Sequence, residues 1–399
     1  MSATNFKLTK FACYAAYFTM SSVFSLPPLL FVTFHEMYGV SWTLLGTLVL
    51  TNFCTQLAVD LIFTVFSKKF NVQKIVRIMP LITSLGLLIY AVFPMVLPDL
   101  AYLGLLIGTV VFSVSAGLSE VLLSPTIAAI PSDNPQRDMS MLHSLYAFGV
   151  FTVVVIGTLF IKFFGAENWM YLTMFFALLP VIAAVLFILS PMPDMNGEST
   201  AAAAGKSRKR TIGIALCVGC IFLGSCAENA MSNWISGYME AQLNIDKAFG
   251  DILGMAVFAV LLGITRISYA KWGKNISKML LAGMIGAAVC YLVAGLSTHV
   301  VPAFIACILT GIFTSMLWPG TLILMEEKVP GAGVASYALM AAGGDLGASV
   351  APQLLGVMAD NVSLQAGMLV CSVFPILGIV LMAVIMWFFR RKNTETAVL

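Results

Sequence analysis

Apolar stretches of about 20 residues recur along the whole chain, and each is long enough to cross a bilayer as one helix. The 399 residues are 60% hydrophobic and 10% charged, whereas a soluble domain carries about 25% charged residues. The sequence therefore predicts an all-α integral membrane protein with about twelve transmembrane helices. The predicted spans are residues 8–34, 42–67, 75–96, 101–129, 141–164, 168–190, 211–240, 249–270, 276–297, 302–325, 333–359 and 364–389.

Basic residues cluster after the second predicted span, before the seventh, after the eighth and at the end of the twelfth. If both termini are cytoplasmic, all these clusters fall on the cytoplasmic side, and only Lys162 and Lys247 lie near the opposite face. This is the positive-inside pattern, and it predicts a multi-pass protein of the cell (inner or plasma) membrane. The basic clusters therefore indicate topology, and no nucleic-acid partner is expected.

Catalytic and metal-binding motifs are not found. Cys217 and Cys220 have the spacing of some metal or redox sites, but they lie in an apolar helix without a second ligand pair, so we interpret them as packing residues. We find no His-rich metal set, phosphate loop or nucleophile motif. The sequence predicts neither an enzyme nor a cofactor, and no metal site.

The polar segment 191–210 divides the spans six and six, and the two sides carry matching breaks. Pro125 is followed by Gly149 about 24 residues later, and Pro319 is followed by Gly343 at the same distance. This predicts an N-terminal six-helix bundle (1–190), a cytoplasmic linker (191–210) and a C-terminal six-helix bundle (211–399). Parallel six-helix repeats around a midplane site describe the major facilitator fold.

Glu120 lies deep inside the fourth span. A carboxylate there costs about 2.5–3.5 kcal/mol, and such a group usually persists because it faces a protein-lined cavity. Burial disfavours its ionised form, so its protonation can respond to the side of the membrane that the cavity faces. We predict that Glu120 couples protons to transport. The alternative is a buried partner of a basic group on another helix.

Asn52, Gln56 and Asp60 follow one another at intervals of four residues and share one face of the second span. We predict a polar wall on the path of a solute, with Asn52 and Gln56 binding the solute and Asp60 assisting proton transfer. The alternative is a ladder of hydrogen bonds that holds this helix in place.

The seventh span carries Glu228, Asn229, Asn233 and Trp234. Amides with aromatic rings are the usual surfaces for sugar hydroxyls and sugar ring faces, although other polar solutes bind the same groups. We predict that Asn229, Asn233 and Trp234 bind the solute and that Glu228 is a second proton-coupling group.

Five further residues are weighed between two roles. His143, which titrates near neutral pH, is a solute ligand or a structural group. Tyr17 and Trp318 are expected in the solute cavity, with core packing as the alternative. Arg266 is expected to act as a conformational latch or a topology anchor. Asp345 is a conformational acid in the cavity or a partner of a neighbouring helix.

The segments 115–125 and 142–149 resemble the fucose:proton symporter family of the major facilitator superfamily. The resemblance implies that Glu120 is the membrane-embedded proton-coupling Glu of that family and that His143 stands where the family commonly has a solute-binding Gln. Ser124 stands in place of the usual Asn before the proline. Both departures change the hydrogen-bonding groups, so the resemblance implies a small polar solute and not fucose in particular.

Together these patterns predict proton-coupled uptake of a sugar or another small polar solute by alternating access. The expected partners are the solute, for which a monosaccharide is a candidate, together with protons and the lipid bilayer. The expected active form is a monomer. Proton-driven efflux of an amphipathic compound is one alternative, although the Asp and Pro motifs typical of efflux transporters are missing. A non-transporting membrane sensor is the other.

Overall fold

The computed structural model describes residues 6–66, 69–133, 135–193, 208–273, 275–329 and 334–396, and within these ranges it is built from helices without a strand. The predicted all-α membrane fold is confirmed. The first half of the chain forms α1 (Lys7–Leu29), α2 (Phe31–Tyr38), α3 (Trp42–Phe66), α4 (Val72–Val96), α5 (Ala101–Ala128), α6 (Pro135–Phe164) and α7 (Trp169–Leu189), with short 3-10 turns at Pro98–Leu100 and Ala166–Asn168.

The second half starts with α8, which continues into a π-helical segment, and a second π-helical segment links α9 to α10. The helices are α8 (Arg208–Gly237), η4 (Tyr238–Gln242), α9 (Lys247–Phe249), η5 (Gly250–Ala256), α10 (Val257–Trp272), α11 (Ile276–Leu296), α12 (Val300–Thr314), α13 (Pro319–Lys328), α14 (Val334–Asn361), α15 (Leu364–Cys371) and α16 (Val373–Thr396).

Ten spans in the described ranges are long and apolar enough to cross a membrane, and the pair α1 and α2 adds an eleventh. This pair is bent by 47°. Pro27 and Pro28 lie just before the bend, where each removes a backbone donor from the helix. The remaining predicted span, 333–359, corresponds to α14, which is 28 residues long but more polar than the others. Since α14 packs against both α3 and α8, protein covers much of its surface.

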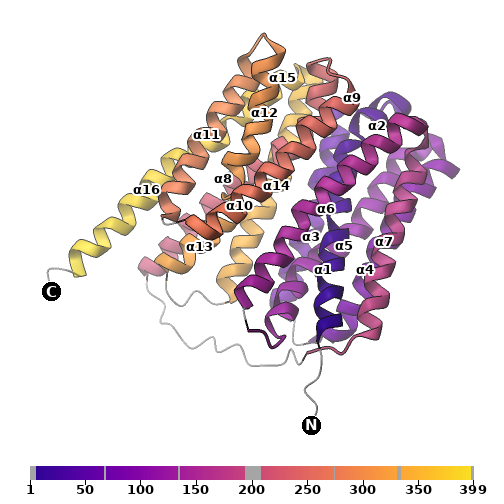
Figure 1. Ribbon diagram of the computed structural model, residues 1–399. Coiled ribbons are helices and arrows are strands. Elements are labelled where there is room, and N and C mark those ends of the chain that lie inside the picture. The colour runs from indigo at the N-terminus through magenta and orange to yellow at the C-terminus, as the bar shows by residue number, and fades with distance from the viewer. Residues whose placement is uncertain are drawn as a thin grey trace.

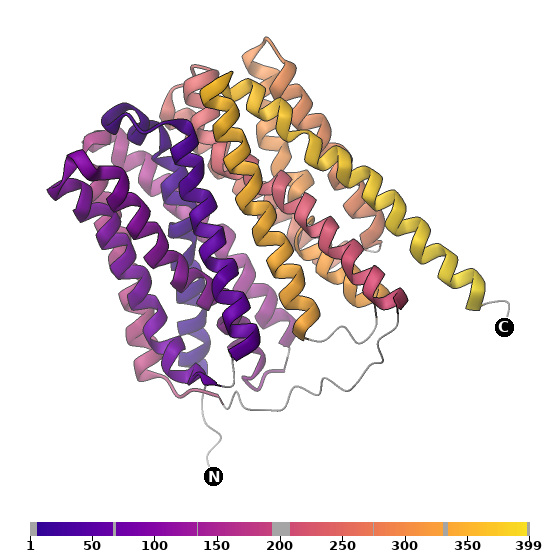
Figure 2. The ribbon, with the colours of Figure 1, turned by 180° about the vertical axis from the view of Figure 1, so that it is seen from behind.

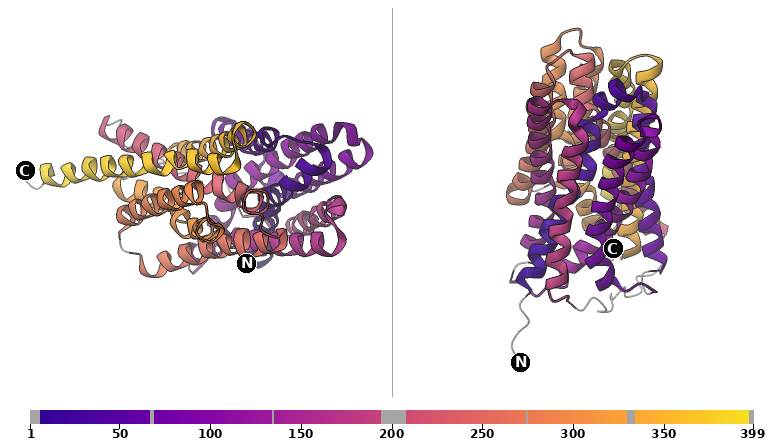
Figure 3. Two further views of the ribbon diagram at one scale, coloured as in Figure 1. Left: turned by 90° about the horizontal axis from the view of Figure 1, so that it is seen from above. Right: turned by 90° about the vertical axis from the view of Figure 1, so that its right-hand side faces the viewer.

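The helices form two groups side by side, α1–α7 and α8–α16, which we call the N-terminal and C-terminal halves (Figures 1 and 2). Seen from above, the halves lie along a common seam (Figure 3). At the seam α3 packs on α14, α6 packs on α10, and α1 packs on α8. Residues 194–207 lie outside the described ranges, so the division into bundles 1–190 and 211–399 and the linker 191–210 stay predictions.

Side chains on the two surfaces of each helix differ as a lipid environment requires. Large apolar residues such as Leu85, Leu178 and Ile182 are exposed on the perimeter, where a bilayer would cover them. Inside the N-terminal half, Gly86 lets α4 approach α5 closely, because a methyl group there would collide with Phe112.

We use "distal end" for the end of the bundle that carries α2, α9 and α15, at the top of Figure 1 and away from the N-terminus.

Candidate functional site

Three carboxyl groups from both halves meet at the seam. Asp60 on α3, Glu120 on α5 and Asp345 on α14 each offer one oxygen, and these oxygens lie within 4.8 Å of one another. The side chains of Asp60 and Asp345 are buried, and both carboxyl groups lie within electrostatic range of that of Glu120. Ionised carboxylates repel one another, so carboxyl groups this close favour a protonated form for at least one of them. We call these three residues the acid cluster.

The acid cluster continues the row of amides on α3. Gln56 donates to Asn52 at 2.9 Å, and Ser113 on α5 donates to Asn52 at 2.7 Å. Gly117 lets the two helices approach, because a methyl group there would lie 3.1 Å from the Cα of Gln56. Asn52 therefore makes the interhelical hydrogen bonds that the alternative interpretation describes. The amide oxygen of Gln56 is buried and receives no hydrogen bond from the described residues. The predicted solute-binding role of this row stays a prediction.

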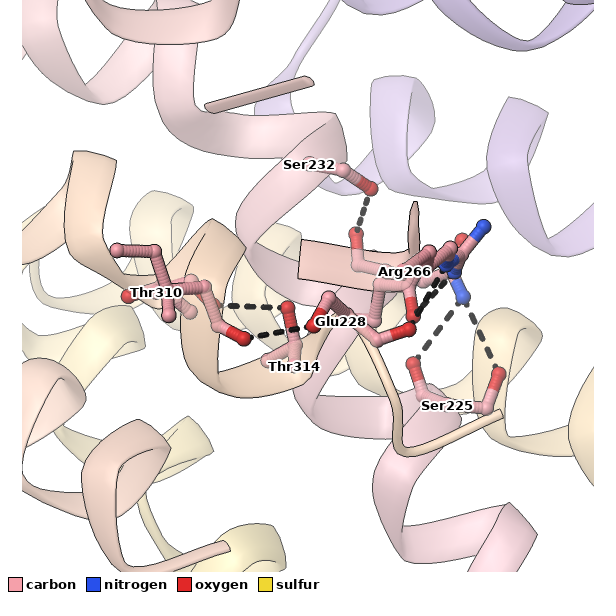
Figure 4. A network of polar contacts seen from close by, with 9 residues as sticks. Ser225, Glu228, Ser232, Arg266, Thr310 and Thr314 are labelled. Carbon is pink, nitrogen blue, oxygen red and sulfur yellow. Dashed lines mark hydrogen bonds and ion pairs between the residues drawn. The ribbon is translucent and has the colours of Figure 1, made fainter. Parts of the chain in front are cut away.

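Arg266 on α10 pairs with Glu228 on α8, so the pair lies within the C-terminal half. The two Arg266–Glu228 hydrogen bonds from the same guanidinium nitrogen measure 3.0 and 3.4 Å, and Nε of Arg266 donates to the carbonyl of Ser315 at 2.8 Å. Figure 4 shows the two side chains directed at one another. Because each charge neutralises the other, the pair can exist within the membrane. Arg266 therefore has a defined acidic partner, which the sequence did not identify.

Asn229 and Asn233 lie next to this ion pair on α8. The side-chain nitrogen of Asn229 donates to the carbonyl and the hydroxyl of Ser225, both at 3.1 Å, and Asn233 donates to the carbonyl of Asn229 at 2.8 Å. Ser225 is drawn beside the pair in Figure 4. These bonds leave the amide oxygens of both side chains available as acceptors, and the solute-binding role of both residues stays a prediction.

Tyr146 on α6 connects the two charged groups, and the sequence interpretation missed it. Its hydroxyl lies within electrostatic range of Glu120, Glu228 and Arg266, so Tyr146 is near both the acid cluster and the ion pair. The ring of Tyr17 on α1 packs edge-on against it at 6.5 Å and is also within electrostatic range of Glu120 and Arg266. The ring of Tyr17 is buried in the core, so its predicted place in the solute cavity stays a prediction beside the alternative of core packing. The position of Tyr146, one helical turn from His143, was the available signal.

The two predicted tryptophans lie apart. Trp234 is fully buried toward the distal end, donates its indole N–H to the carbonyl of Pro352 at 3.0 Å and packs against Phe31 and Trp42. Trp318 lies against the backbone of Gly344, beside the acid cluster. Solute binding by either residue stays a prediction. The side chain of His143 lies outside the described residues, so its predicted role cannot be placed on the structure.

The packing role of the cysteines agrees with their positions. Cys217 and Cys220 are buried free thiols, and the sulfur of Cys220 lies 3.6 Å from the hydroxyl of Thr321.

Comparison with known proteins identifies the fold. Residues 217–398 match the family model of the Major Facilitator Superfamily. The chain has the Major Facilitator Superfamily fold. The predicted resemblance to this superfamily is confirmed, and the family and fold are those of multi-pass membrane transporters. No curated protein sequence matches the chain.

Solved structures of the same fold cover nearly the whole chain at low identity. A D-xylose-proton symporter superposes with a TM-score of 0.80 at 13% identity, over 96% of this chain and 97% of that chain. The fucose:proton symporter FucP of E. coli gives 0.61 at 13% identity, over 95% and 99%. A bacterial homolog of the human lysosomal transporter Spinster, in an inward-facing conformation, gives 0.76 at 12% identity, over 96% and 97%. At these identities the likeness establishes the fold.

Proposed function

We propose that this protein is a proton symporter that takes up a sugar or another small polar solute. The observation that carries the proposal is the acid cluster, in which buried carboxyl groups from both halves lie within 4.8 Å of one another. Alternating access moves the halves against each other around a central site. The distances between carboxyl groups on opposite sides of the seam would therefore change with this movement. The sugar–proton symporters among the structural neighbours support the same choice.

Protons would couple to movement through the repulsion of like charges. Two ionised carboxylates 4.8 Å apart repel by about 3.5 kcal/mol at an effective dielectric constant of about 20. When Glu120 takes up a proton and Asp60 shares one with Asp345, this repulsion is removed and α3 can pack on α14. Loss of the protons restores the repulsion and favours separation of the seam at the cluster.

The solute would bind between the halves, next to the acid cluster. Tyr17 and Tyr146 from the N-terminal half and the Glu228–Arg266 pair from the C-terminal half lie within electrostatic range of each other. Hydroxyl groups, a carboxylate and a guanidinium are suitable partners for the hydroxyls of a sugar. Glu228 is then a solute ligand held by Arg266, and Glu120 carries the coupling proton.

The orientation follows the charge pattern. With both termini in the cytoplasm of the cell, the distal end faces outward. Trp234 packs across the seam against Phe31 and Trp42 at that end, so in this orientation the closed end would face the outside. Uptake would then finish by release of the solute and the proton to the cytoplasm.

The test is internal pH in proteoliposomes that contain a trapped pH dye and are challenged with pools of monosaccharides and other small polar solutes. The wild type should acidify the lumen with one pool. Glu120→Gln should abolish that acidification but retain solute exchange at equal concentrations on both sides. Glu167→Gln makes the same chemical change at an exposed loop residue and should behave like the wild type.

Three results would contradict the proposal, provided that the protein elutes as a folded species. Glu120→Gln could accumulate solute at the full rate, which would exclude this residue as the proton carrier. Alternatively, no pool could change the internal pH, whereas a gradient of amphipathic compounds does, which would indicate efflux. Binding of a solute without flux would indicate a sensor.

A further inference from the structure

At the distal end of the seam, charged side chains of the C-terminal half contact the ends of helices in the N-terminal half. Asp360, at the end of α14, accepts hydrogen bonds from the backbone N–H groups of Trp42 at 2.9 Å and Thr43 at 2.7 Å. These are the first two residues of α3 in the other half. The first N–H groups of a helix have no partner within it, and the helix dipole favours a negative charge there. Within its own half, α3 is capped by Ser41, whose hydroxyl accepts a hydrogen bond from the N–H of Leu44 at 3.3 Å.

A second contact has the opposite polarity. Lys247, the first residue of α9, donates to the carbonyl oxygen of Leu29 at 3.0 Å. Leu29 is the last residue of α1, in the other half, where the chain bends into α2. The last carbonyl groups of a helix lack partners, and the dipole favours a positive charge at that end. The negative Asp360 therefore lies at the N-terminus of a helix in the other half, and the positive Lys247 lies at the C-terminus of one. Each charge is at the helix end where the dipole favours its sign.

The Lys247 ammonium is held in place by two acids of its own half. Glu240 lies 3.0 Å away, and Asp251 lies 3.5 Å away and is buried. Asp251 also accepts a hydrogen bond from Thr158 on α6 at 3.2 Å, across the seam. Glu240 and Asp251 lie in the two π-helical segments η4 and η5 that flank α9, and π-helical turns are frequent at functional sites.

Close backbone packing surrounds these contacts. A methyl group on Gly356 of α14 would lie 2.6 Å from the carbonyl oxygen of Trp42, and one on Gly46 of α3 would lie 3.2 Å from the carbonyl oxygen of Pro352. The helix ends therefore reach their capping groups only when the two halves are in contact. The bonds from Trp42 and Thr43 to Asp360, from Lys247 to Leu29 and from Thr158 to Asp251 join the halves, so opening of the distal end must break them.

We propose that Asp360 and Lys247 act as helix caps supplied across the seam, and that these two caps together hold the distal end closed. Their release is then the step that lets this end open. The closed state depends on them whatever solute or ion is carried, so the inference stands apart from the proposed proton symport. Replacing a capping Asp by Ala costs a helix about 0.5–2 kcal/mol, which corresponds to about a 2- to 30-fold change in an equilibrium constant.

The test is the distance between the distal ends of the two halves, measured by pulsed electron spin resonance on the full chain in lipid. Spin labels at Leu100→Cys and Val301→Cys mark exposed positions in different halves. Cys54→Ser removes the exposed native thiol, while the other cysteines are buried. Asp360→Ala should raise the ratio of distal-open to distal-closed molecules about 2- to 30-fold, and Asp360→Asn should raise it less, because an amide oxygen still accepts a hydrogen bond.

Two further variants separate capping from packing. Glu167→Gln removes an exposed charge from the same end of the bundle and should leave the distances unchanged. Gly356→Ala should open the distal end by a steric route. If Gly356→Ala opens it and folded Asp360→Ala does not, packing alone closes the seam and the inference is wrong.

The second cap is tested with Lys247→Gln, compared with the wild type at matched thermal stability. This change should add to the effect of Asp360→Ala, and absence of a change overturns the second cap.

Discussion

Removal of Arg266 while Glu228 remains should destabilise the fold more than removal of both. The side chains of Arg266 and Glu228 are 27% and 17% exposed, so the pair is mostly withdrawn from solvent. At the 3.0 Å that separates the two atoms, unit charges attract by about 5.5 kcal/mol at an effective dielectric constant of about 20. Desolvation offsets much of this attraction, but breaking a buried pair by removing one partner costs about 3–5 kcal/mol, since the other charge stays buried and unpaired.

Arg266→Met should therefore lower the free energy of unfolding by about 3–5 kcal/mol, and a double variant with Glu228→Met should recover most of that loss. The assay is denaturant titration of the detergent-solubilised protein for both single variants and the double variant. Lys162→Gln, which removes an exposed basic residue outside the pair, should leave the free energy unchanged. If the double variant loses as much as the two single variants summed, the two charges do not interact and the reasoning is refuted.

Two other changes follow from local geometry. Gly344→Ala puts a methyl group into the Trp318 ring, and overpacking of this kind costs about 1–3 kcal/mol, so the melting temperature should fall, whereas an unchanged value would show that the ring moves aside freely. Asp138, before the membrane span of α6, has its pKa lowered by hydrogen bonds from Lys10 and Ser132. Its ionised form therefore stabilises the fold above the ordinary pKa of about 3.9, and this contribution is lost as the pH falls through the lowered value. Thermal melting of Asp138→Asn should lose that acid-dependent step, and an identical pH profile would contradict it.

Much of the fold could be predicted because the length of each apolar stretch, which predicts a membrane span, is a local property of the sequence. The predicted span 333–359 corresponds to α14, Val334–Asn361, and the break predicted at Pro319 lies between α12 and α13. The first span was predicted as one helix over 8–34, and the structure bends it by 47° after Leu29 and extends it to Tyr38. The two π-helical segments had no sequence signal.

The candidate site was predictable only in part, because its geometry depends on helices distant in the sequence. Glu120 and Asp60 could be singled out as acids in apolar helices, but only packing of α14 on α3 brings Asp345 to them. The partner of Arg266 was unknown for the same reason. Asp360 was missed because an acid at the end of a span is ordinarily a solvated residue, and only the structure places it on the N-terminus of α3.

In the proposed symport mechanism, the acid cluster holds a proton that responds to the solute. Infrared difference spectroscopy detects it directly, because a protonated carboxyl group has a C=O stretching band that a carboxylate lacks. We expect this band in the wild type at neutral pH, a change in it when the transported solute is added, and its reduction in Asp345→Asn but not in Glu167→Gln. A wild type without the band, or a band that Asp60→Asn, Glu120→Gln and Asp345→Asn all leave unchanged, would show that the acid cluster does not hold the coupling proton.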